Sequence, residues 1–170
     1  METPIVNRVA NSALQSIDLA EYLDNHENSE FDISQGLFQG LVLKEKEFRQ
    51  FVKEFDWSQY QGKNVAVHCS ADAIVPSWAY MLVASRLEPL AHLVVFGDQE
   101  DLEKQRVDQA ITRLIEQDLT DAKVVIKGCG NLSNRDYAYF ELAKRLTPVV
   151  SSLMYGEPCS TVPVYKRPRN

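Results

Sequence analysis

The chain alternates between short apolar runs and longer segments in which apolar residues recur at helical spacing. The short runs are rich in β-branched residues, which is typical of buried strands. They are residues 65–67, 93–96, 124–126 and 153–155. Between them, apolar residues three or four positions apart predict helices. These cover residues 77–87, 99–116 and 137–146. Strands and helices are therefore predicted to alternate from residue 63 onward.

A further helix is predicted from about residue 41, ahead of the first strand. Its signal is a set of apolar side chains at helical spacing, with charged residues on the opposite side: Phe48, Phe51, Val52 and Phe55. Residues 1–23 hold apolar side chains without a clear period, and we interpret them as an irregular arm or a short strand.

The second half of this pattern repeats the first. Residues 78–98 return as residues 137–157, 59 positions later and without a gap, and seven of the aligned positions are identical. The identical residues of the first copy are Ala79, Tyr80, Ala84, Arg86, Leu87, Pro89 and Gly97. One duplicated strand, helix and strand unit is the simplest explanation.

Strands that are joined by helices pair in parallel through right-handed crossovers. We therefore predict an α/β three-layer sandwich with a mostly parallel sheet, built from a duplicated βαβ unit, plus an N-terminal arm and helix. With 170 residues, 45% of them apolar, the chain is long enough for a single domain without disulfides or a structural metal. Its predicted parts are the arm and packing helix 1–62, the first repeat 63–98, the linker helix 99–121, the second repeat 122–157 and the C-terminal tail 158–170.

Charge and hydropathy exclude two classes of partner. A net charge of -6 disfavours binding to phosphate backbones, and we interpret the basic residues Lys166, Arg167 and Arg169 as a solvated terminus. No apolar run is as long as a membrane span, and the first residues lack the basic and apolar regions of a secretory signal. We expect a cytoplasmic protein without nucleic-acid or membrane partners, and we leave open whether it forms a homo-oligomer.

Three cysteines are the main candidates for chemistry. Cys69, Cys129 and Cys159 each follow a predicted strand, in loops of small residues. Parallel strands end at one edge of a sheet, where α/β proteins bind ligands, so we expect the three thiols to meet there. Thiolate sulfur suits zinc or an iron-sulfur cluster. The first hypothesis is a metal- or iron-sulfur-binding accessory protein that uses these cysteines, with Asp72 or water as a fourth ligand.

Two other interpretations stay open. Small neighbouring residues leave backbone N–H groups free to form an anion-binding nest that lowers the pKa of a thiol, so Cys129 or Cys69 is a candidate nucleophile or persulfide carrier. Whether the chain is an enzyme is therefore uncertain. Alternatively, the cysteines are packing residues and the duplicated fold is the scaffold of a non-catalytic interaction domain. Asp98 and Glu157, at equivalent positions of the repeats, are candidates for site acids or for helix caps.

Several motifs spread along the chain resemble one known family. They are NRVANS at 7–12, FQGL at 38–41, HCSADA at 68–73, WAY at 78–80, KGC at 127–129 and GEPCSTVP at 156–163. With these motifs the chain resembles a bacterial domain-of-unknown-function family over nearly its whole length. The resemblance implies a soluble single-domain protein without an established activity or known site residues. It also implies iron-sulfur assembly proteins as partners, which favours a thiolate site used in iron or sulfur handling.

Overall fold

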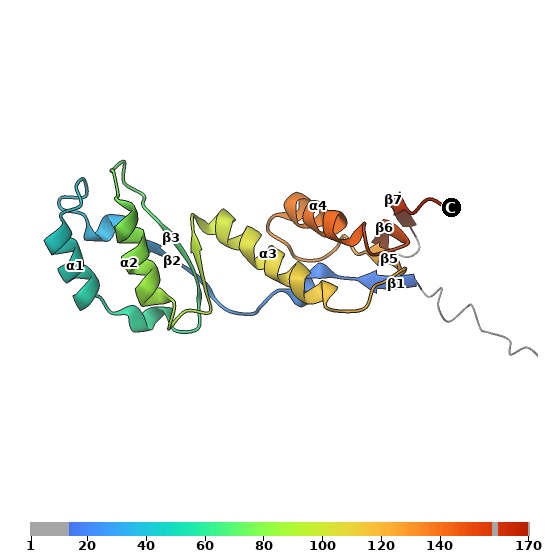
Figure 1. Ribbon diagram of the computed structural model, residues 1–170, viewed down its shortest axis with the longest axis horizontal. Helices are drawn as coiled ribbons and strands as arrows, with labels where there is room; N and C mark the ends of the chain where they lie inside the picture. The colour runs from blue at the N-terminus through green and yellow to red at the C-terminus, as the bar shows by residue number, and fades with distance from the viewer. Residues whose placement is uncertain (1–13, 158–159, 170) are drawn as a thin grey trace, which may run out of the picture. The chain divides into compact units, whose positions relative to one another are not determined.

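The computed structural model describes residues 14–157 and 160–169, and the chain forms two compact units. Unit 1 combines the segments Met1–Asp24 and Arg106–Asn170, and unit 2 is the continuous segment Asn25–Gln105. The boundary along the chain falls within helix α3 (Gln99–Ile115). Each unit has its own sheet and its own apolar core, and Figure 1 labels their helices and strands.

Unit 2 is built on three parallel strands in the order β2-β3-β4. Its elements are β2 (Asn28–Asp32), the 3-10 helix η3 (Ile33–Gly36), α1 (Glu45–Glu54), the 3-10 helix η4 (Trp57–Tyr60), β3 (Asn64–His68), α2 (Ser77–Leu87) and β4 (Leu93–Phe96). Helix α1 buries Phe48 and Val52, which lie one turn apart, against the same core as α2. Phe31 of β2 is fully buried at the centre of this core, and the ring of Trp57 packs 4.9 Å from its ring.

Unit 1 is built on four strands in the order β1-β5-β6-β7. Its elements are β1 (Leu14–Ile17), the 3-10 helix η2 (Leu19–Tyr22), β5 (Lys123–Ile126), α4 (Arg135–Leu146), β6 (Ser152–Glu157) and β7 (Ser160–Lys166). The first three strands are parallel, whereas β7 runs antiparallel to β6. Helix α4 and the later turns of α3 contribute to one apolar core on this sheet, with Leu114 and Leu142 fully buried in it.

The two repeats fold with the same strand register. Asn64 of β3 lies opposite Leu93 of β4, and 59 positions later Lys123 of β5 lies opposite Ser152 of β6. Each pair also gains a parallel strand from the N-terminal part of the chain, β2 beside β3 and β1 beside β5. Both added strands lead into a 3-10 helix that is capped by an aspartate side chain. The structural repeat is therefore larger than the sequence repeat.

The α/β class, the mostly parallel pairing and the duplicated βαβ unit are confirmed. One correction is that the strands form two sheets, because each repeat pairs its first strand with an N-terminal strand and not with the first strand of the other repeat. The segment that we predicted to be a tail is extended, but its residues 160–166 pair as strand β7. In the part of the chain that the structure describes, no helix is long and apolar enough to cross a membrane.

The repeat predicts a matched pair of destabilising substitutions. Leu87 and Leu146 occupy equivalent positions and are fully buried, so Leu87→Ala and Leu146→Ala should each lower the free energy of unfolding of their unit by about 2–5 kcal/mol. Met81→Ala, on the exposed side of α2, should change it by less than about 0.5 kcal/mol. Urea unfolding measures both units by circular dichroism and unit 2 by fluorescence, because Trp57 and Trp78 lie there. A loss below about 1 kcal/mol for Leu87→Ala would contradict its place in the core.

Candidate functional site

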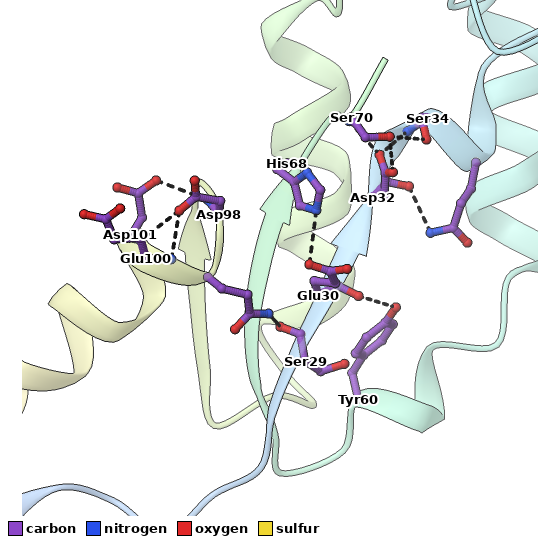
Figure 2. A network of polar contacts seen from close by, with 12 residues as sticks. Ser29, Glu30, Asp32, Ser34, Tyr60, His68, Ser70, Asp98, Glu100 and Asp101 are labelled. Carbon is purple, nitrogen blue, oxygen red and sulfur yellow. Dashed lines mark hydrogen bonds and ion pairs between the residues drawn. The ribbon is translucent and has the colours of Figure 1, made fainter. Parts of the chain in front are cut away.

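Polar side chains gather where the strands of unit 2 end. Asp32 is the last residue of β2, His68 is the last residue of β3, and Asp98 follows β4. Parallel pairing brings these ends to one edge of the sheet, and Figure 2 shows the three side chains there together with Glu30 and Ser70. Open α/β sheets bind ligands at this edge. The partners of each group therefore decide what chemistry the edge offers.

Asp32 fastens the end of β2 to the loop after β3. Its Oδ1 accepts the backbone N–H groups of Ser34 at 2.9 Å and Ser70 at 3.0 Å, and its Oδ2 accepts the hydroxyl of Ser70. Burial by itself raises the pKa of Asp32, but the hydrogen bonds from Ser70 and Ser34 outweigh it and hold this pKa well below its usual range. Asp32 is therefore a charged structural clamp at neutral pH.

His68 and Asp98 are also engaged with neighbouring groups. The Nε2 atom of His68 lies 3.5 Å from Oε2 of Glu30. The Oδ1 atom of Asp98 accepts the backbone N–H groups of Glu100 at 2.8 Å and Asp101 at 3.1 Å, at the start of α3. Hydrogen bonding with the Asp101 backbone is the largest cause of the lowered pKa of Asp98, and His68 lowers it further. Of its two predicted roles, Asp98 fills that of a helix cap.

Cys69 lies beside the apolar core of unit 2. It is half-buried and packs against the core, and its Sγ donates to the carbonyl oxygen of Ala71 at 3.6 Å. Asp72 lies in the same loop and is exposed. The surroundings of Cys69 are therefore those of a small packing residue at the rim of the core.

Cys129 lies in unit 1, in the exposed loop between β5 and α4. Its Sγ donates to Oε1 of Glu157 at 3.3 Å, and this hydrogen bond and the negative charge of Glu157 raise the pKa of Cys129. A thiol in an anion-binding nest would have a lowered pKa instead. Close packing explains the neighbouring glycine, because a Cβ atom at position 128 would lie 2.5 Å from the hydroxyl oxygen of Tyr155.

Cys69 and Cys129 do not share the sheet edge that the sequence predicted for them. Cys69 follows a strand of the three-stranded sheet and Cys129 follows a strand of the four-stranded sheet, while Cys159 lies outside the described residues. Within residues 14–157 and 160–169, no group of three or more His, Cys, Asp or Glu residues is arranged to hold a metal ion. Zinc or iron-sulfur binding through Cys69, Cys129, Cys159 and Asp72 stays a prediction, as does thiol chemistry at Cys129 or Cys69.

An apolar groove lies beside β4, at the edge of the unit 2 sheet. It has a volume of about 560 Å³ and runs between α2 and β4. Its walls include Val67, Tyr80, Met81, Ala84, Val94 and Phe96. Phe96 and Met81 are 73% and 70% exposed, and the rings of Tyr80 and Phe96 pack edge to face at 5.0 Å. Two large apolar side chains therefore face solvent on a concave surface.

Unit 1 contains the equivalent surface, but a strand covers its outer edge. A cavity of about 340 Å³ is lined there by Tyr139, Ala143, Leu153 and Tyr155, each 59 positions after a residue of the groove. The rings of Tyr139 and Tyr155 pack edge to face at 5.2 Å, as in unit 2. Strand β7 pairs with the outer edge of β6, and its Val164 lines the cavity. Among the described residues, no strand pairs with the outer edge of β4.

Sequence reasoning missed this groove. Its signal is an aromatic pair 16 positions apart in each repeat, Tyr80 with Phe96 and Tyr139 with Tyr155. Spacing alone does not show whether such a pair fills the core or borders a hollow, because that depends on the strand that lies outside it.

Comparisons with known proteins identify the family. A family model described as a protein of unknown function (DUF2480) matches residues 3–167. The chain belongs to the DUF2480 family. This finding confirms the resemblance to a domain-of-unknown-function family. No curated protein and no solved structure matches this DUF2480 chain significantly.

The clamp at Asp32 gives the DUF2480 chain a stability that depends on pH. The pKa of Asp32 is lowered from 3.8, so its contribution is complete above that value and is lost as the pH falls toward the lower pKa of the folded state. We expect Asp32→Asn to lower the free energy of unfolding by about 1–2 kcal/mol at pH 7. The difference in the free energy of unfolding between wild type and variant should narrow by about 1 kcal/mol at pH 3. The reason is that only the wild-type unfolded state takes up a proton at this position.

Urea unfolding at both pH values measures this difference. Asp72→Asn, the same change at an exposed position, should shift the free energy of unfolding by less than about 0.5 kcal/mol. A destabilisation by Asp32→Asn that stays equal at pH 7 and pH 3 would show that the charge of Asp32 does not stabilise the fold.

The contact with Glu157 predicts a low reactivity of Cys129. Glu157→Gln removes the negative charge that raises the pKa of this thiol, so alkylation of Cys129 by iodoacetamide at pH 7.5 should become faster by a factor of about two to ten. Peptide mapping by mass spectrometry measures the rate at each cysteine, and Cys69 serves as the internal control. An unchanged rate at Cys129 would mean that Glu157 does not control its ionisation in solution.

Proposed function

We propose that this DUF2480 protein is a non-catalytic interaction domain that binds another protein in the groove between α2 and β4. The observation that carries the proposal is the exposure of Phe96 and Met81 on the walls of one concave surface. Contiguous apolar patches of this kind on folded proteins mark interaction sites. Burial of such side chains by a partner contributes about 25 cal/mol for each Å² of apolar area that is removed from water.

The strand beside the groove supports the same proposal. β4 reads Leu-Val-Val-Phe and contains no charged residue and no proline. Charges and prolines are the usual protection of an edge strand against pairing with other chains. A partner that covers this edge would pair its main-chain groups and bury the adjoining apolar wall in a single contact.

The polar edge of unit 2 and the exposed thiol support a role other than catalysis. Asp32 and Asp98 serve as a clamp and a helix cap and have lowered pKa values, whereas the pKa of Cys129 is raised. A general base or a thiol nucleophile works best with a pKa near the working pH. The pKa values of Asp32, Asp98 and Cys129 are all shifted away from neutral pH.

The chemistry of the groove describes the expected partner. It should present an extended apolar segment, since the surface combines an apolar hollow with a strand edge. Iron-sulfur assembly proteins, which the sequence resemblance implies as partners, are the first to examine, and the proposal assigns the complex to the cytoplasm.

Site-specific photo-crosslinking in cells tests the proposal with a control inside the same chain. Met81 and Phe140 are equivalent positions of the repeats and are 70% and 68% exposed. A benzoylphenylalanine at position 81 should give a discrete crosslinked product, whereas one at position 140 should not. Phe96→Ser, which removes an apolar wall of the groove, should reduce the product at position 81 by about tenfold.

Two outcomes would contradict the proposed function. Equal crosslinking from positions 81 and 140 would indicate nonspecific contact, and a product at position 81 that survives Phe96→Ser would place the partner outside the groove. Circular dichroism of the purified Phe96→Ser variant controls for loss of the fold.

A further inference from the structure

The second repeat of the chain carries its own example of a strand bound at the equivalent edge. Strand β7 pairs antiparallel with β6, with Val162 opposite Tyr155 and Tyr165 opposite Leu153. The register shifts between these pairs, so that Val164 has no partner residue on β6. Val164 lines the cavity together with Tyr139. The bound strand therefore contributes main-chain pairing and one β-branched side chain to the hollow.

Strands β4 and β6 offer the same template to such a partner. Each pairs in parallel on its inner side with the first strand of its repeat, in the same register. Phe96 and Val94 of β4 are equivalent to Tyr155 and Leu153 of β6, which come 59 positions later in the sequence. The edge that receives β7 in unit 1 is therefore present in unit 2 with a more apolar surface.

The course of the chain explains why no described strand pairs with the outer edge of β4. Gly97, directly after β4, and the equivalent Gly156, near the end of β6, both have a positive φ, of 132° and 124°. After Gly156 the chain returns as β7, whereas after Gly97 it continues into α3. The chain after β4 therefore does not return to pair with it, although the glycine at the equivalent position has kept its positive φ.

Resting on the interaction function above, we propose that the partner adds an extended segment antiparallel to β4, as β7 is added to β6. The segment places an aliphatic β-branched side chain in the groove beside Tyr80 and Phe96. A proline is accepted in it, since Pro163 of β7 pairs opposite Met154 at an edge where one N–H group is dispensable. The cavity of about 340 Å³ in unit 1 is space that remains beside Val164, and the groove of about 560 Å³ has no added strand among the described residues, so it has room for an isoleucine, which buries one methylene more than a valine.

The probe for this proposal is a synthetic peptide with the sequence of residues 160–167, Ser-Thr-Val-Pro-Val-Tyr-Lys-Arg. It is added to the full-length protein labelled for nuclear magnetic resonance. We expect shift changes at the amides of β4 and at the methyl groups of Val67 and Met81. Nuclear Overhauser effects between peptide Val162 and protein Phe96, and between peptide Tyr165 and protein Val94, should define the antiparallel register.

Substitutions in the peptide and in the protein test the fit. A peptide with isoleucine in place of Val164 should bind about fourfold more tightly, the equivalent of one additional buried methylene. Ala84→Arg fills the groove from the exposed side of α2 and should abolish these shift changes. Phe140→Arg adds the same charge to the equivalent helix α4 and should leave them unchanged. Unperturbed spectra of the unliganded variants outside the substituted site control for the fold.

Three outcomes would overturn the proposal. The peptide gives no shift changes at β4, it gives them only at β6 by exchange with β7, or the protein without peptide shows contacts between the β4 strands of two copies. The proposed interaction function is judged separately by the crosslinking. A product at position 81 that depends on Phe96, without peptide binding, would retain the interaction domain and reject strand addition.

Discussion

The parallel pairing of two strands beneath one crossover helix is the constraint on which the rest of this DUF2480 structure depends. It sets the register of β3 with β4 and of β5 with β6, and it buries the last leucine of each helix, Leu87 and Leu146. Because paired strands point the same way, the segments that follow them meet at one edge, and there Asp32 fastens the end of β2 to the loop after β3. The second strand of each pair lies toward the outside of its sheet, with a hollow between it and the helix.

The two repeats have kept this framework and changed what surrounds it. In unit 1 the hollow is lined by two tyrosines, Tyr139 and Tyr155, and β7 covers its edge. In unit 2 Phe96 replaces one tyrosine, and no described strand covers the edge. A more apolar wall and an open edge occur in the same copy. This combination favours an interaction surface over a mere remnant of the duplication, because an exposed apolar edge without a partner promotes aggregation.

Much of the fold could be predicted because local chemistry sets it. Helix α2 has the predicted bounds 77–87, since Pro76 precedes it and Pro89 prevents its continuation, and the apolar run 93–96 coincides with β4. The choice of strand partners could not be predicted, because β1 lies within residues 1–23, which lack a clear period, and β2 contains a single apolar residue, Phe31. Strand β7 was missed because Pro163 and Pro168 are typical of a tail, although an edge strand tolerates proline.

The candidate site was less predictable than the fold for a related reason. The thiols were expected to meet because they follow strands, but proximity depends on which strands share a sheet, and Cys69 and Cys129 follow strands of different sheets. The raised pKa of Cys129 depends on Glu157, which is 28 positions away in sequence. Neither the choice of sheet nor the contact with Glu157 has a local signal in the sequence. The aromatic pairs of the repeats did have one, but its meaning depended on β7.

The position of β7 has a consequence for how many ligands one chain can hold. Each repeat supplies one hollow beside the second strand of its pair, and β7 pairs with the edge of one of them. A molecule with two vacant acceptor edges could link partners into open-ended chains, as any bivalent connector does. Under the proposed function, β7 closes one of the two edges, so the chain would offer one such attachment and its complexes would stay finite.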